Sequence, residues 1–166
     1  MRNVATSRAV LAVLAASLAL AALPTQAAAQ AAGPYQYHSL TPCRFVETRT
    51  NQPPPNTPPV LSSDTTRTFQ AQGLCNIPVG VKAVSINITA IRPSGAGFLT
   101  LFPTGIPRPT TVSSINFAAG EPGIANGAIV SLADQATYPQ DLSVYAWTGP
   151  GAGTVHLVLD VTGYFQ

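Results

Sequence analysis

The amino-acid sequence predicts an all-β fold, a single antiparallel β-sandwich of about eight or nine strands. Proline and glycine contribute 16 and 13 of the 166 residues, too many for a helical bundle and without a collagen-like period. Short runs of alternating apolar and polar residues recur between Gly, Pro and Asn clusters, and helical periodicity is absent after the first 30 residues. This pattern fits either a jelly-roll or an immunoglobulin-like sandwich.

The first 29 residues have the pattern of a secretory signal peptide. Arg2 and Arg8 provide positive charge, and residues 9–23 form an uncharged apolar run that stops before Pro24. Alanines at 27–29 predict cleavage after Ala29 and a short tail at residues 30–34. The run is shorter than the roughly 20 apolar residues of a membrane-spanning helix. An uncleaved anchor is the alternative interpretation.

Removal of this leader changes the charge of the protein. Without Arg2 and Arg8 the eight basic residues become six, equal to the six acidic residues, so the formal net charge is zero. A neutral chain lacks the basic surface of a nucleic-acid-binding protein. No other segment is long and apolar enough for a bilayer, so no membrane contact is expected after cleavage. The neutral surface favours self-association.

The remaining sequence reads as one domain over residues 35–166. The strand pattern occurs at residues 35–40, 44–48, 65–71, 82–91, 98–102, 111–117, 125–133, 141–147 and 154–161. The first two of these segments are irregular. Five prolines between residues 50 and 64 predict a stiff, polyproline-like surface loop between the second and third strands.

Three of the later segments alternate most clearly. In residues 82–91, one face is apolar and one polar: Val84, Ile86, Ile88 and Ala90 oppose Ser85, Asn87 and Thr89. In residues 141–147 the two faces are Leu142, Val144 and Ala146 against Ser143, Tyr145 and Trp147. In residues 154–161 they are Val155, Leu157, Leu159 and Val161 against His156, Val158 and Asp160. Successive strand residues point to opposite faces, so each segment buries its apolar side.

Cys43 and Cys75 are the two cysteines of the chain. In an exported protein a single disulfide is the default interpretation. It would join the two ends of the proline-rich loop and limit the conformational entropy lost when this long loop is closed. A redox pair or a metal site has little support, because there is no C-x-x-C motif and no nearby histidine.

Several motifs, in order, resemble those of a group of secreted bacterial β-rich proteins and modules. Residues 41–49, TPCRFVETR, match T-P-C-R-x-x-[DE]-T-R, and residues 156–165, HLVLDVTGYF, match H-x-x-x-D-V-x-G-Y-F. Residues 73–78, 84–89, 114–117 and 125–126 match further landmarks. Glu47 stands where the group usually has Asp, and Gly127 where a second Asn is common. The resemblance implies an extracellular β module and implies no reaction.

Four charged residues are candidates for structural ion pairs: Arg44, Glu47, Arg49 and Asp160. Arginine binds carboxylates through two N–H groups, so one of these arginines is expected to pair with Glu47 or Asp160. Glycoside hydrolysis is the alternative role for the two acids, and it needs a defined separation between them. No G-x-S-x-G motif occurs, so no catalytic residue is assigned.

The sequence assigns no cofactor and no metal site, because metal-binding motifs such as D-x-D-x-D-G and H-E-x-x-H are missing. Calcium held by Asp160, Asn126 and backbone carbonyl groups is the alternative.

Tyr145 and Trp147 are candidates for ligand binding. They share the polar face of their strand and precede a glycine-rich turn, so an exposed pair could stack on a sugar or another apolar partner. The alternative is that this face is also buried. His156 is a third candidate, expected as a hydrogen-bonded histidine on a half-buried face, about 13 Å along the strand from Asp160.

These observations predict a non-catalytic module, structural or adhesive, that is secreted, at the cell surface or in the periplasm. A cell-surface glycan or a protein is the expected partner. A carbohydrate-binding module is the alternative function, and a hydrolase is a weaker one.

Overall fold

The computed structural model describes residues 34–49 and 58–166. The predicted signal peptide at 1–29 and residues 50–57 of the predicted proline-rich loop lie outside this described part. The described residues group into one compact unit. No helix in the described part is long and apolar enough to cross a membrane.

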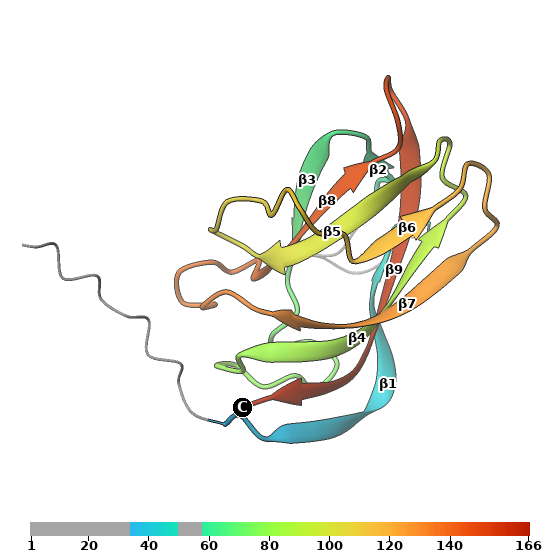
Figure 1. Cartoon of the computed structure of the whole chain (residues 1–166). Coiled ribbons are helices and arrows are strands. Elements are labelled where there is room, and N and C mark those ends of the chain that lie inside the picture. The colour runs from blue at the N-terminus through green and yellow to red at the C-terminus, as the bar shows by residue number, and fades with distance from the viewer. Residues whose placement is uncertain (1–33, 50–57) are drawn as a thin grey trace, which may run out of the picture. The chain divides into compact units, whose positions relative to one another are not determined.

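Nine strands make up the described part (Figure 1). They are β1 (Tyr37–Glu47), β2 (Leu61–Ser62), β3 (Thr65–Phe69), β4 (Ala83–Ile91), β5 (Gly97–Pro103), β6 (Ile115–Phe117), β7 (Ile124–Ser131), β8 (Leu142–Trp147) and β9 (Thr154–Phe165).

The strands form two antiparallel sheets, which confirms the predicted sandwich. One sheet has the order β1-β9-β4-β7, with β2 pairing the start of β9, and the other has the order β3-β8-β5-β6. Figure 1 shows the second sheet above the first. The pairs β5/β6, β4/β7, β3/β8 and β1/β9 are nested like one long hairpin, whose coiling also brings β9 beside β4 and β8 beside β5. This is the jelly-roll topology rather than the immunoglobulin-like one.

The core lies between the inner faces of the two sheets. The alternating apolar residues of β4, β8 and β9 all enter one buried cluster, together with Leu99 and Leu101 of β5. Each strand therefore buries the face that its sequence made apolar. Ser85, Asn87 and Thr89 lie half-buried on the outer face of β4, as the alternation predicted.

Several strands differ from the sequence expectation. Residues 61–62, within the predicted surface loop at 50–64, form the short strand β2, which pairs with β9 and buries Leu61, so the surface-loop prediction is wrong for this part. The segments 35–40 and 44–48 are one strand, β1, whose register with β9 shifts between Ser39 and Cys43 and again between Arg44 and Val46. Pro42 lies in the first shifted stretch and has no N–H to donate to the ladder. The irregular sequence therefore marks a disrupted ladder inside one strand.

The last strand is longer and the sixth is shorter than expected. β9 continues to Phe165, and Tyr37 of β1 covers Gly163, where a Cβ atom would lie 2.4 Å from the tyrosine oxygen. β6 contains only residues 115–117. Before it, the Ser114 N–H still donates to the Leu99 carbonyl at 2.8 Å, and two side-chain bonds join the preceding segment to β5. Thr100 Oγ1 donates to the carbonyl of Val112 (3.0 Å), and Ser114 Oγ accepts the N–H of Leu101 (2.9 Å).

The predicted disulfide between Cys43 and Cys75 is confirmed, with 5.7 Å between the Cα atoms. It links β1 to the turn that follows β3. The backbone of this turn is closed by hydrogen bonds from Gly73 N–H to the Ile77 carbonyl and from Ile77 N–H to the Leu74 carbonyl, both 2.8 Å.

Candidate functional site: a neutral groove beside Trp147

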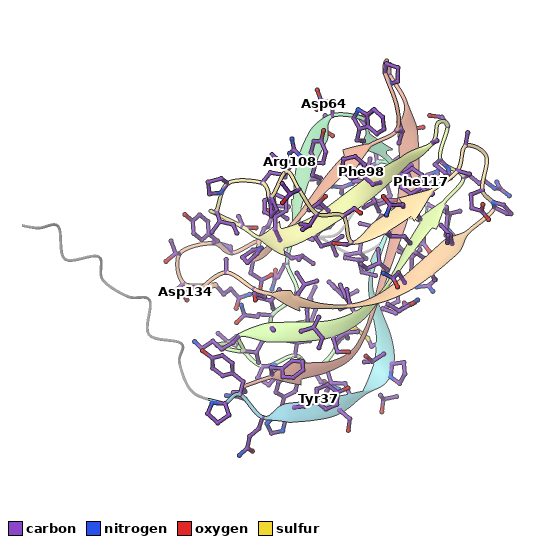
Figure 2. The ribbon with its side chains drawn as sticks, in the orientation of Figure 1. Tyr37, Asp64, Phe98, Arg108, Phe117 and Asp134 are labelled. Carbon is purple, nitrogen blue, oxygen red and sulfur yellow. A yellow bond between two sulfur atoms is a disulfide. The ribbon has the colours of Figure 1, made fainter. Side chains whose placement is uncertain are left out.

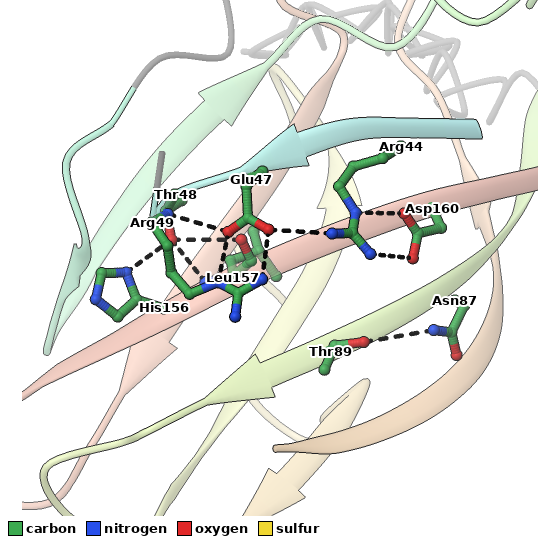
Figure 3. A network of polar contacts seen from close by, with 9 residues as sticks. All are labelled: Arg44, Glu47, Thr48, Arg49, Asn87, Thr89, His156, Leu157 and Asp160. Atoms are coloured by element: carbon green, nitrogen blue, oxygen red, sulfur yellow. Dashed lines mark hydrogen bonds and ion pairs between the residues drawn. The ribbon is translucent and has the colours of Figure 1, made fainter. Parts of the chain in front are cut away.

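The four ion-pair candidates form one network on the outer face of the β1-β9-β4-β7 sheet (Figure 3). Glu47, at the end of β1, is only 3% exposed. Its carboxylate accepts from Arg49 Nε (2.8 Å), Arg49 Nη2 (2.6 Å) and the Arg49 backbone N–H (3.1 Å). Arg44 donates to Glu47 (3.2 Å) and, through Nε and Nη2, to both oxygens of Asp160 (2.8 and 3.2 Å).

These contacts set the charge state of the network. The Arg49 side chain, with smaller contributions from its backbone N–H and from Arg44, holds the pKa of Glu47 below its ordinary value, against the opposing effect of burial. The hydrogen bond with Asp160 raises the pKa of Arg44, and the one with Glu47 raises that of Arg49. An ionised Glu47 is a poor proton donor at neutral pH, so the network is suited to holding β1 on β9.

His156 lies at the side of this network and is half-buried. Its Nδ1 is 3.2 Å from Thr48 Oγ1, and the same oxygen accepts the N–H of Leu157 at 2.8 Å. Thr48 thus continues the attachment of β1 to β9 after the strand ends. Thr48 is the threonine of the T-R pair that ends the first motif, but its residue type does not predict a bond to β9, because a threonine beside charged residues is common on any strand surface.

Tyr145 is buried and Trp147 is partly exposed, so the alternative of a buried face holds at Tyr145 and the two residues do not form an exposed pair. Tyr145 is 6% exposed; its hydroxyl donates to Asp64 (2.7 Å), and the Arg108 guanidinium lies 4.0 Å from the ring centroid. The hydrogen bond to Asp64 and burial raise the pKa of Tyr145. Arg108 belongs to the β5–β6 loop, residues 104–114, and Figure 2 shows it on the side of the molecule that carries Asp64. The loop covers Tyr145.

Trp147 lies beyond this cover. It is 36% exposed and is paired across the sheet with Phe98, which is paired in turn with Asn116. The Trp147 and Phe98 rings have centroids 5.7 Å apart and an interplanar angle of 30°. Trp147, Phe98 and Asn116 therefore form one row across β8, β5 and β6 on the outer face of their sheet.

This row lies in an open groove of about 720 Å³, here called the Trp147 groove. That volume is within the range of about 300–1,000 Å³ that is usual for ligand sites. The groove is lined by Ser94, Gly95, Ala96, Gly97, Phe98, Asn116, Phe117, Trp147, Thr148, Gly149, Pro150 and Gly153. A smaller hollow of about 200 Å³ shares Phe98 and Asn116 and adds residues 110–113 of the β5–β6 loop. The two hollows meet at Phe98 and Asn116.

One wall of the groove is built by two turns packed against each other. A Cβ at Gly97 would lie 1.9 Å from the Trp147 carbonyl oxygen, and a Cβ at Gly95 would lie 2.2 Å from that of Thr148. A Cβ at Gly153 would lie 1.9 Å from Thr148 Oγ1. These three positions need glycine because the β4–β5 and β8–β9 turns approach so closely. The sequence indicated only a glycine-rich turn after Trp147, and the close packing of two turns leaves no local pattern.

The other acidic side chains near the sheets have structural partners. Asp141 is fully buried and accepts the backbone N–H groups of Ala71 (2.7 Å) and Gln72 (3.0 Å). Asp134 accepts the N–H of Ala136. Gln72, also buried, donates to the Ala133 carbonyl and accepts from Gly80 N–H. These buried polar bonds were missed because their partners are distant in sequence.

The two residues considered for calcium have other partners. Asp160 is paired with Arg44, and Asn126 Nδ2 donates to the Ser114 carbonyl at 2.8 Å. Over residues 34–49 and 58–166, no group of three or more His, Cys, Asp or Glu side chains is placed to hold a metal ion.

Comparison with known proteins gives a distant likeness of fold. No family model matches the chain, and no curated protein matches it. Among solved structures it is similar to the coat protein of Tobacco streak virus in two crystal structures. One is of the dimer (TM-score 0.35, 78% of this chain and 85% of that one) and one of a C2 crystal form (TM-score 0.34, 78% and 86%). The sequence identity is 10% in both.

Proposed function

We propose that this protein is an exported, non-catalytic recognition module that holds an extracellular partner in the Trp147 groove. The observation that carries the proposal is the row of Trp147, Phe98 and Asn116 on the outer face of its sheet. The β5–β6 loop covers the neighbouring Tyr145 on the same face and leaves this row open. A half-exposed tryptophan in an open groove offers a large apolar contact area to a partner.

Four carboxylates of the protein are held by structural partners, which supports a non-catalytic role. Glu47 and Asp160 are held by arginines, Asp141 by backbone N–H groups, and Asp64 by the Tyr145 hydroxyl. Catalytic carboxylates are instead arranged so that neighbours push their pKa values apart. The arginine contacts lower the pKa of Glu47, which suits a permanent ion pair.

The proposal of export rests on two features. Residues 1–29 have the sequence pattern of a cleaved leader. The Cys43–Cys75 disulfide is compatible with an oxidising compartment outside the cytoplasm. The resemblance to secreted bacterial modules points to the same location, with adhesion at the cell surface as the biological role.

Binding to envelope material of the source cells tests this function. The protein is produced from the full chain, collected after export and labelled, and its retention is compared with that of Trp147→Ala. Ile129→Ser is the matched control, because Ile129 is 67% exposed on β7 in the other sheet. We expect saturable retention of the wild type and the control and loss of retention for Trp147→Ala. Equal retention of all three would reject the Trp147 groove as the recognition site.

A further inference from the structure

We infer that the Trp147 groove binds an uncharged glycan, with a sugar ring stacked on Trp147 and Phe98 and its hydroxyl groups bonded by Asn116 and the neighbouring Ser and Thr side chains. This inference rests on the proposed function and names the class of ligand for the same groove.

The aromatic floor has the chemistry that a sugar ring needs. A pyranose has an apolar face of C–H groups that packs against an aromatic ring, while its hydroxyl groups point outward along the edge. Trp147 and Phe98 lie side by side with a tilt of 30°, so they form a continuous apolar surface rather than one isolated ring. Tyr145 is not part of this surface because Arg108 covers it.

The groove is electrically neutral, which favours a neutral ligand. None of the residues that line the groove or the adjoining hollow has an ionisable side chain. An anionic polymer such as a nucleic acid or an acidic glycan would leave its charges without a partner there, and the lost hydration of those charges opposes binding. A neutral sugar carries no such penalty.

Polar groups stand at the edge of the aromatic floor. Asn116 Nδ2 donates to Ser113 Oγ at 2.9 Å, so Asn116 Oδ1 remains as an acceptor for a ligand hydroxyl. Thr110, Thr111 and Ser113 are exposed and line the adjoining hollow. Hydroxyl and amide groups can both donate and accept, as sugar hydroxyl groups do.

Thr148 has a buried hydroxyl group in the groove wall. It is 4% exposed, and its Oγ1 has no hydrogen-bond partner among the described residues. Buried hydroxyl groups without partners are rare in folded proteins and call for a specific explanation. The packed turns enclose this oxygen between Gly153 and Ser94, so a ligand in the groove does not reach it and the glycan inference does not rest on it.

The walls of the groove are preformed. Gly95, Gly97 and Gly153 let the two turns pack at distances that no side chain would permit, and Ser94 Oγ accepts the N–H of Thr154 at 2.8 Å. A site that is ordered before binding loses less conformational entropy when it binds. This suits recognition of a stiff polysaccharide segment.

The single tryptophan of the chain makes the test direct, since its fluorescence reports on this groove alone. The exported protein is screened on an array of neutral and acidic glycans, and each hit is titrated by tryptophan fluorescence and calorimetry. We expect hits among neutral glycans, with a saturable shift in emission. Phe98→Ala and Asn116→Ala should each weaken binding about tenfold, the loss of roughly 1.4 kcal/mol of contact energy. Ile129→Ser should bind like the wild type.

Trp147→Phe guards against a folding defect, because it keeps an aromatic ring in the groove. It should retain more affinity than Trp147→Ala by calorimetry, with both variants folded as judged by their thermal unfolding. The inference is overturned if no neutral glycan binds, or if only acidic glycans bind.

The two proposals fail in different ways. Retention on envelope material that depends on Trp147, without binding to any neutral glycan, would reject the sugar and keep the groove as a protein-binding site. Retention that is indifferent to Trp147 would reject the proposed function itself.

Discussion

At the residue scale, Glu47 shows how a buried carboxylate is kept in its ionised form. Its side chain accepts from two arginines and one backbone N–H while the arginines keep contact with solvent. The desolvation of a single carboxylate is thus offset by several charge-assisted hydrogen bonds. Trp147 is the reverse case: Glu47 is a charged side chain that is buried, whereas Trp147 is a large apolar side chain that remains partly exposed to water.

Replacing Glu47 with Gln tests the network. The amide keeps the volume of the side chain but removes the charge, so the bonds from Arg49 and Arg44 weaken. We expect a loss of about 1–2 kcal/mol in the free energy of unfolding, at the lower end for charged hydrogen bonds because both arginines are half-exposed. Urea unfolding at neutral pH measures it, with Glu121→Gln as the matched control at a carboxylate outside this network. A change smaller than that of the control would contradict a structural role.

The same variant has a predicted pH dependence. The pKa of Glu47 lies below its ordinary value of 4.5 in the folded state, so the unfolded chain takes up the proton first as the pH falls. The stabilisation is therefore complete at neutral pH, declines as the pH approaches 4.5 and is lost below the folded pKa. As the pH falls from neutral through 4.5, the wild type should lose more stability than Glu47→Gln. Parallel curves for the two proteins would show that Glu47 is not stabilised by its charge.

At the scale of elements, the Trp147 groove depends on how two turns meet at the ends of β5 and β8. The backbone carbonyls of Trp147 and Thr148 lie where Cβ atoms of Gly97 and Gly95 would be. The approach of β5 to β8 is thus set by the lack of side chains at these positions. The β5–β6 loop forms the boundary of the groove on the Tyr145 side.

Gly97→Ala tests this packing, with Gly127→Ala as its match. The new methyl group at residue 97 would overlap the Trp147 carbonyl, whereas at residue 127 it would meet nothing within 4 Å. We expect Gly97→Ala to lower the free energy of unfolding by about 1–3 kcal/mol and to shift the tryptophan emission. Gly127→Ala should leave both unchanged. Similar melting temperatures for the two variants would contradict the close approach of the turns.

At the scale of the whole molecule, the jelly roll joins strands that are far apart in sequence. β1 pairs with β9, and β3 with β8, so most of the chain must be in place before either sheet is complete. The disulfide links β1 to the turn after β3, so it restricts the conformations that the unfolded chain must sample before these strands pair. Its loop spans 32 residues and includes the proline-rich segment.

Removal of the disulfide in Cys43→Ala/Cys75→Ala should lower the free energy of unfolding by about 3–4 kcal/mol, as loop-closure entropy predicts for a loop of this length. Denaturant unfolding of this variant is compared with that of the wild type under oxidising and reducing conditions. The reduced wild type should match the variant. If the variant keeps the stability of the oxidised protein, the crosslink does not constrain the unfolded chain.

Much of the fold follows from the sequence at short range. The period of two in β4, β8 and β9 identified both the strands and their buried faces, because side chains alternate along any strand. The two cysteines and the arginines beside Glu47 and Asp160 were identified by residue type. The single strand β1 was divided in two, because a disrupted ladder at Pro42 looks like a strand end in sequence.

The alternation of residues 141–147 placed Tyr145 and Trp147 on one face of the strand, but it did not predict which of the two is exposed. Only the tertiary structure decided that the β5–β6 loop buries the first and leaves the second beside Phe98 and Asn116. The order of the strands and the jelly-roll topology were decided in the same way. The sequence by itself determined the class of fold, the buried faces and the crosslink, since these depend on local period and chemistry. The groove depends on contacts between strands far apart in the chain, and such contacts leave no local pattern.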